Sequence, residues 1–144
     1  MSIAKKLNPY LSDLVVMYLK LHDLHWKVKG KMFVQVHLYT EARYDDLAAK
    51  FDAVAELLIM GGEAPVSTIA QYLEQASIKE LGQEKYSDSE VLDIITKDFE
   101  HLKAEAADIR AYAVEQDAFS AVAIMEEHIA SYDKELWFLK SMME

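Results

Sequence analysis

Residues 33–62 read FVQVHLYTEARYDDLAAKFDAVAELLIMGG and carry the longest uninterrupted helical pattern of the chain. Neither Gly nor Pro interrupts this stretch before Gly61-Gly62, which supplies a stop signal, and Pro65 lies just beyond. The pattern therefore predicts a helix over residues 33–60, about 40 Å long at ~1.5 Å per residue.

A second long helix is expected on the N-terminal side of this stretch. Asn8 followed by Pro9 is typical of a helix cap and the first helical position, and apolar side chains recur after it at three- and four-residue steps. Gly30, flanked by two lysines, indicates the end of this helix.

The C-terminal half of the chain predicts two more long helices after a long crossover. Residues 67–76 have the spacing of a short helix within that crossover, and residues 87–90 read as a capping box that opens the third long helix. We expect this helix to end near Gln116, and the last, capped by Asp117, to run to about Met142. The plan is that of an all-α four-helix bundle with a short extra helix in the crossover between the second and third long helices.

Composition agrees with one helical domain over residues 1–144. Four Gly and two Pro are too few for the turns of an all-β sandwich, and 52% hydrophobic residues can fill one core. The absence of Cys excludes disulfides, iron–sulfur clusters and thiolate metal sites, so any metal needs His, Asp and Glu. A net charge of −10 disfavours nucleic acid and anionic membranes as partners. No apolar run approaches the ~20 residues of a membrane helix, so a cytoplasmic protein is expected.

A polar stripe on the helix of residues 33–60 is the main candidate for chemistry. It includes His37, Glu41, Asp52 and Glu56 at helical spacing, and the ordinary interpretation is a solvated helix face. Against that interpretation, Asp52 and Glu56 are like charges four residues apart, an arrangement that a cation between them would stabilise. His25 continues the apolar stripe of the first helix and points inward, either as a core histidine or as a ligand.

Helix geometry limits how these residues can share a metal. His37 and Asp52 are about 22 Å apart along one helix, whereas the ligands of one ion lie within roughly 2.0–2.3 Å of it. If His25 and His37 form one half-site and Asp52 with Glu56 the other, a second subunit must complete both, for example across a two-fold axis. The Glu-x-x-His pairs of an intramolecular di-iron bundle are absent from the sequence.

The ordered set of motifs resembles the Dps family of ferritin-like proteins. Residues 22–37, HDLHWKVKGKMFVQVH, are similar to the LHxxHWxxxGxxFxxxH segment of that family, and residues 52–56, DAVAE, to its DxxAE element. Similarity continues through Gly61-Gly62, Pro65 and the segment around residues 72–78.

This resemblance implies an iron-storage and detoxification protein that is also an enzyme, a ferroxidase. Fe(II) would be oxidised with hydrogen peroxide at two-iron centres between subunits, and the Fe(III) mineral stored in a shell of twelve subunits, which protects DNA and cell from oxidative damage. The implied iron ligands are His25 and His37 of one subunit with Asp52 and Glu56 of its neighbour, and Glu41 is an additional metal-site carboxylate. Trp26 either donates an electron near the centre or fills the subunit interface. His101 and His128 match no motif and are expected at the surface.

Two other functions stay open at this point. A DNA-condensing nucleoid protein with incidental iron chemistry is disfavoured by the acidic balance and by the lack of basic tails. A helical interaction domain without metal would leave the polar stripe merely solvated. The assembly state distinguishes this metal-free domain from a protein with an intersubunit metal centre, because a monomer cannot form such a centre.

Overall fold

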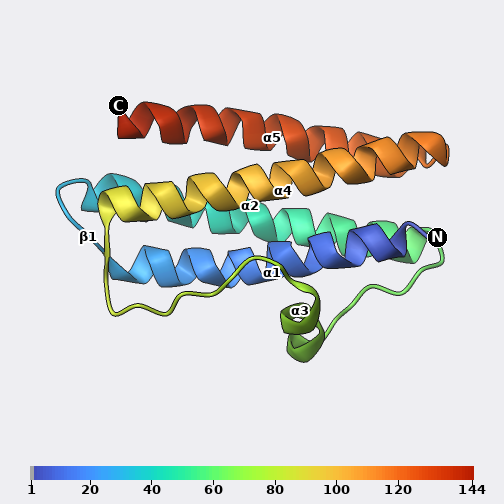
Figure 1. Cartoon of the computed structure of the whole chain (residues 1–144), viewed down its shortest axis with the longest axis horizontal. Coiled ribbons are helices and arrows are strands. Elements are labelled where there is room, and N and C mark those ends of the chain that lie inside the picture. Colours follow the sequence, from blue (N-terminus) through green and yellow to red (C-terminus); the bar gives the residue numbers. More distant parts are fainter. Residues whose placement is uncertain (1) are drawn as a thin grey trace.

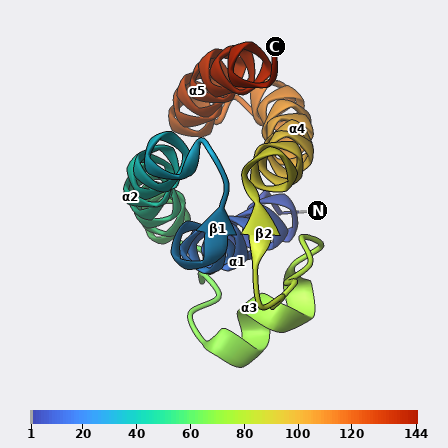
Figure 2. The same cartoon turned by 90° about the vertical axis from the view of Figure 1, so that its left-hand side faces the viewer.

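The computed structural model describes residues 2–144, and these are almost entirely helical. The four long helices surround a common core of buried side chains, and the view along the bundle shows how they are arranged (Figure 2). The antiparallel pair α1 and α2 packs beside the antiparallel pair α4 and α5 (Figure 1). These helices are α1 (Ala4–Lys27), α2 (Phe33–Met60), α4 (Asp88–Glu115) and α5 (Phe119–Met143). The predicted four-helix bundle is confirmed.

The crossover between α2 and α4 runs back along the bundle, because both helices start at the same end (Figure 1). It contains the short helix α3 (Ile69–Gln75), which packs against α1. Thr68 caps α3 by accepting a hydrogen bond from the backbone N–H of Gln71, whose side chain accepts from the backbone N–H of Thr68 in return. The extra helix in the crossover is therefore confirmed as well.

Several predicted helix ends agree with the structure. α2 spans Phe33–Met60, as its pattern indicated. The capping box at the start of α4 is present: Ser87 Oγ accepts from the backbone N–H of Glu90 at 3.1 Å, and Glu90 Oε1 accepts from that of Ser87 at 3.2 Å. These ends are local in origin, which is why sequence predicts them.

Two predicted caps are wrong. α1 begins at Ala4, so Asn8 lies inside the helix. Its side chain instead donates to the carbonyl of Ala64 and accepts from the N–H of Val66, and thereby ties the loop after α2 to α1. Asp117 does not cap α5; it adopts a positive φ of 53° in the turn, and the cap position is Ala118. In both cases tertiary contacts or turn geometry override a local capping preference.

A two-residue parallel strand pair closes the end of the bundle where α2 and α4 begin. β1 (Val28–Lys29) pairs with β2 (Tyr86–Ser87), which joins the end of α1 to the start of α4. Gly30 follows with a φ of +133°, a conformation that side chains disfavour. A Cβ on Gly30 would lie 2.5 Å from Asp88 Oδ2, an atom that accepts a hydrogen bond from the N–H of Met32.

Replacing Gly30 with Ala should therefore destabilise the fold by about 2 kcal/mol, because backbone strain and a steric clash act together. Gly62→Ala is the matched control, since Gly62 also has a positive φ, of +77°, but a methyl group added there would meet open space. Urea unfolding of both variants measures the difference. Equal losses would show that the contact with Asp88 contributes nothing.

The long helices are amphipathic and bury one face each in the core. Fully buried apolar side chains come from all four, for example Leu14 of α1, Val54 of α2, Ile95 of α4 and Met125 of α5. Within residues 2–144, no helix is long and apolar enough to cross a membrane.

His128 is buried in this core, so its predicted surface position is wrong. Only 4% of the residue is exposed, because it occupies the inward stripe of α5 between Met125 and Tyr132. Its Nδ1 is 2.8 Å from the hydroxyl of Tyr10, which is also 2.6 Å from the hydroxyl of Tyr132. Burial, assisted by the charge of Lys50, lowers the pKa of His128 to about 4.

The lowered pKa of His128 should make folding stability fall in mild acid. Above pH 6.5 the imidazole is neutral in both states and its contribution is complete. Between about pH 6.5 and 4 the unfolded chain binds a proton at His128 and the native state does not, so the free energy of unfolding falls by up to about 3 kcal/mol. Urea unfolding of the wild type and of His128→Gln at pH 7 and pH 4 tests this. A stability difference between the two proteins that does not change with pH would contradict it.

Candidate metal centre

His25 and His37 lie side by side at the junction of α1 and α2. His25 is in the last two turns of α1, His37 is in the second turn of α2, and the turn at Gly30 brings them together. Their rings stack with a centroid separation of 3.7 Å and an angle of 15° between planes. His25 is buried and His37 is half-buried.

Each ring is held by a backbone carbonyl of the other residue. His25 Nδ1 lies 2.7 Å from the carbonyl oxygen of His37, and His37 Nδ1 lies 2.9 Å from that of His25. The hydroxyl of Thr40 is also 3.0 Å from His25 Nδ1. Because a carbonyl oxygen only accepts, each Nδ1 carries the proton, and in the neutral rings each Nε2 keeps a free lone pair. Histidine ligands of metal ions are oriented by the same kind of contact.

Glu41 is the carboxylate next to this pair. It lies one turn after His37 on α2, and its Oε1 is 4.0 Å from His25 Nε2. About half of its side chain is exposed. The geometry offers two imidazole nitrogens with one carboxylate oxygen nearby, a donor set suited to borderline divalent metals.

Asp52 and Glu56 form a separate pair further along α2. Both side chains are exposed, and a hydrogen bond to Asp52 together with its charge raises the pKa of Glu56. A shared proton or a bound cation relieves such repulsion. Since α2 is one continuous helix, the fifteen residues from His37 to Asp52 span about 22 Å, and the chain does not bring the two pairs together.

Trp26 is on the surface beside the histidine pair, with 64% of the residue exposed. Its ring is 5.5 Å from that of His22, which stacks on Tyr44 at 3.7 Å. Trp26 and Leu19 also line a surface hollow of α1 with Leu81 of the crossover. Other exposed apolar side chains on this part of α2 are Phe33, Val34 and Leu38. Exposed apolar groups in this number are typical of an interaction surface.

Comparison with known proteins identifies the family. A family model described as a ferritin-like domain matches residues 4–144. The DNA protection during starvation protein (Dps) of Brevibacillus brevis is 34% identical over 143 residues, which cover 99% of this chain and 95% of the relative. This chain belongs to the Dps family of ferritin-like proteins. A Dps of Helicobacter pylori is 28% identical over 130 residues, with 90% of each chain covered.

Solved Dps structures superpose on the chain over nearly its whole length. Dps from Bacillus brevis has a TM-score of 0.94 at 32% identity, and Dps from Staphylococcus aureus has a TM-score of 0.94 at 28% identity. Each comparison covers 99% of this chain and 95% of the other. The ferritin-like bundle and the resemblance inferred from the motifs are both confirmed.

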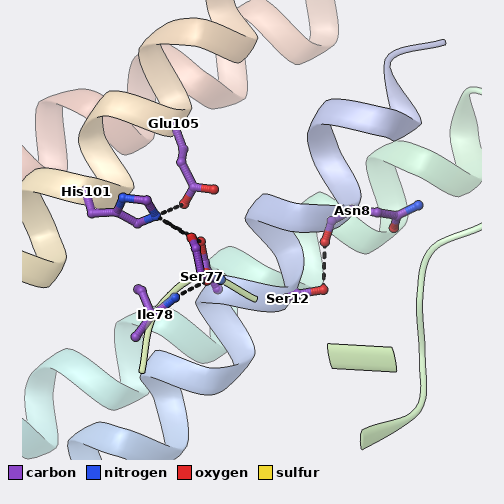
Figure 3. A network of polar contacts seen from close by, with 7 residues as sticks. Asn8, Ser12, Ser77, Ile78, His101 and Glu105 are labelled. Atoms are coloured by element: carbon purple, nitrogen blue, oxygen red, sulfur yellow. Dashed lines mark hydrogen bonds and ion pairs between the residues drawn. The ribbon is translucent and has the colours of Figure 1, made fainter. Parts of the chain in front are cut away.

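One polar cluster in this Dps-family chain was missed by the sequence interpretation. His101, expected at the surface, lies on α4 with Glu105 one turn later, and both point towards Ser77 of the crossover (Figure 3). The buried Asp13 of α1 completes the group, with its Oδ2 at 3.1 Å from His101 Nε2. Burial, followed by the hydrogen bond to Asp13 and its charge, raises the pKa of Glu105 to about 9. The available signal was Asp13 itself, an acidic residue within the apolar stripe of α1.

Proposed function

We propose that this protein is a ferroxidase and iron-storage protein of the Dps family that oxidises Fe(II) with hydrogen peroxide. The observation that carries the proposal is the pair of reciprocal hydrogen bonds, in which each of His25 and His37 donates its Nδ1–H to the backbone carbonyl of the other. These hydrogen bonds occupy both Nδ1 atoms and leave the two Nε2 atoms, on stacked rings at the junction of α1 and α2, available to a metal ion. Core packing alone does not require two histidine rings that are held in this orientation with both Nε2 atoms available.

The four proposed iron ligands are His25 and His37 from one subunit with Asp52 and Glu56 from its neighbour. The imidazoles favour Fe(II) over Mg²⁺ and Ca²⁺, and Zn²⁺ should compete. The carboxylates stabilise the additional positive charge of Fe(III). Glu41 is proposed as an additional carboxylate of the metal site, and Trp26 either supplies an electron or fills the subunit interface.

An intersubunit site is favoured by the length of α2. The histidine pair and the carboxylate pair each present half of a donor set, about 22 Å apart on a helix that a two-fold axis can cross. The exposed apolar side chains around Trp26 would then be covered by the neighbour. We propose that such pairs build a closed shell of twelve subunits.

The reaction consumes Fe(II) and hydrogen peroxide, which together would otherwise form hydroxyl radicals. Two Fe(II) supply two electrons to one hydrogen peroxide molecule, which with two protons yields two waters and two Fe(III). The Fe(III) is stored as an oxyhydroxide mineral inside the shell. Relatives from Brevibacillus brevis and Helicobacter pylori are described as DNA protection during starvation proteins, and one Dps from Vibrio cholerae as a member of the ferritin-like diiron-carboxylate superfamily.

We propose that DNA protection by this protein is chemical and does not depend on DNA binding. The net charge of −10 per chain opposes contact with the phosphate backbone. Removal of Fe(II) and peroxide in the cytoplasm, where iron and DNA occur together, is sufficient to protect the DNA.

Anaerobic addition of Fe(II) followed by hydrogen peroxide, monitored by absorbance, tests the proposed activity. We expect rapid oxidation at two Fe(II) per peroxide, and native mass spectrometry should show an assembly of about 200 kDa, twelve chains of 16.5 kDa. Oxidation no faster than in protein-free buffer would contradict the activity, and a monomer would contradict the intersubunit centre.

A further inference from the structure

The cluster of Asp13, Ser77, His101 and Glu105 lies away from the histidine pair of the proposed iron centre and shares no residue with that centre. Asp13 and His25 are twelve residues apart on α1, which corresponds to about 18 Å along the helix axis. The cluster joins three parts of the chain, namely α1, α4 and the crossover after α3 (Figure 3). All of its members belong to one chain, so it needs no neighbouring subunit.

Three side-chain oxygens converge on one nitrogen in this cluster. His101 Nε2 is 2.7 Å from Ser77 Oγ, 3.1 Å from Asp13 Oδ2 and 3.3 Å from Glu105 Oε1. If Nε2 is protonated, its single hydrogen cannot serve all three oxygens. Glu105 Oε1 is buried and has no hydrogen-bond partner among the described residues, so a proton shared between Glu105 and Asp13 or a bound cation must compensate it.

A divalent cation would satisfy these atoms together. The nearest potential ligand atoms of Asp13, His101 and Glu105 lie within 4.8 Å of one another. Ligands of a tetrahedral zinc ion, at roughly 2.0–2.2 Å from the metal, are about 3.3–3.6 Å apart, close to the two distances measured from Nε2 to the carboxylates. A water can take the fourth position, and 42% of the His101 side chain is exposed, which leaves an entry path.

The carboxylate of Asp13 is already oriented for this role. It is fully buried, and its Oδ1 accepts hydrogen bonds from the backbone N–H groups of Ser77 and Ile78, at 2.7 and 2.8 Å. These bonds leave Oδ2 directed at His101, with a further hydrogen bond from Ser77 Oγ at 2.7 Å. Contacts of this kind orient metal ligands in proteins.

We propose that Asp13, His101 and Glu105 form a second cation site, within one subunit, that binds Zn²⁺ or a similar borderline divalent ion. One imidazole with two carboxylates favours such ions over Mg²⁺ and Ca²⁺. The bound ion fastens the crossover and α4 to α1 and stabilises the fold, since it binds only where the three parts meet. This proposal does not depend on the ferroxidase function.

The test uses a chain whose proposed iron centre is disabled by His25→Ala, His37→Ala, Asp52→Asn and Glu56→Gln. After removal of metals with a chelator, the protein is equilibrated with Zn²⁺, and the bound metal is measured by mass spectrometry of the elements. We expect about one Zn²⁺ per chain, together with a higher melting temperature than that of the metal-free protein. Failure to bind Zn²⁺ would overturn the proposal and leave the ferroxidase function untouched.

Two variants in this background assign the ligands. His101→Ala and Glu105→Gln should each reduce bound Zn²⁺ at least about tenfold and abolish the rise in melting temperature. Glu105→Gln keeps the side-chain volume, so it carries the test if His101→Ala fails to fold. Glu100→Gln, an exposed site on α4, is the matched control and should keep the ion. Undiminished Zn²⁺ binding by Glu105→Gln would overturn the assignment.

Discussion

Replacement of both His25 and His37 with Ala should lower the initial rate of peroxide-driven Fe(II) oxidation about 100-fold, equivalent to ~2.7 kcal/mol of activation free energy. The substitutions remove both nitrogen ligands of the proposed centre and leave the carboxylate pair in place. Stopped-flow absorbance at equal subunit concentration measures the effect, with native mass spectrometry to show that assembly is unchanged.

His22→Ala is the control for this double substitution. His22 lies on α1 one turn before His25, and its Nδ1 is also held by a backbone carbonyl, that of Tyr18, at 2.9 Å. The control therefore removes an imidazole and a similar hydrogen bond without removing a proposed ligand. It should oxidise Fe(II) at close to the wild-type rate. Equal rates in the wild type and the double variant would exclude the histidine pair from the reaction.

Subunits with complementary defects should restore activity when they assemble together. One subunit carries His25→Ala with His37→Ala, and the other carries Asp52→Asn with Glu56→Gln. In a random one-to-one shell, half of the two-fold pairs are mixed and one of their two centres is intact, so about a quarter of all centres work. The co-expressed shell should therefore show about a quarter of the wild-type rate, against ~1% for either variant alone.

Shells of the two variants that are assembled separately and then combined are the control for complementation. Without subunit exchange they contain no intact centre and should stay inactive, and native mass spectrometry reports the exchange. Mixed shells no more active than their parents would contradict an intersubunit centre. They would leave open a centre built within one chain, which the double histidine variant tests separately.

The helices that sequence predicted well are those whose limits are set locally. α2 ends at Gly61-Gly62, and α4 starts at the capping box of Ser87 and Glu90, because both signals act within a few residues of the helix end. Asn8 and Asp117 are also typical helix-capping residues, but neither caps a helix here: Asp117 lies in the turn before α5 with a positive φ. Asn8 holds the backbone of the loop after α2, a contact across 56 residues of sequence that no local pattern reveals.

The histidines at the candidate sites also divide into features set by nearby residues and features set by distant contacts. The proximity of His25 and His37 follows from their spacing around Gly30, but their reciprocal Nδ1 contacts depend on the exact path of the turn. His128 and His101 were assigned to the surface because they match no motif. Burial of His128 depends on α1, which supplies Tyr10, and the cluster around His101 depends on Asp13 and the crossover.

The helical class and the order of the long helices follow from the order of residues along the chain, because periodicity, caps and spacing are short-range properties that are visible without a structure. The family and the residues proposed to bind iron follow from the resemblance of the sequence motifs to those of Dps proteins. Three features required the packed fold: which imidazole nitrogens are free, that His128 lies in the core, and that Asp13 meets His101 and Glu105. Those features depend on side chains up to 118 residues apart, whose contacts arise only when the four helices and the crossover pack around one core.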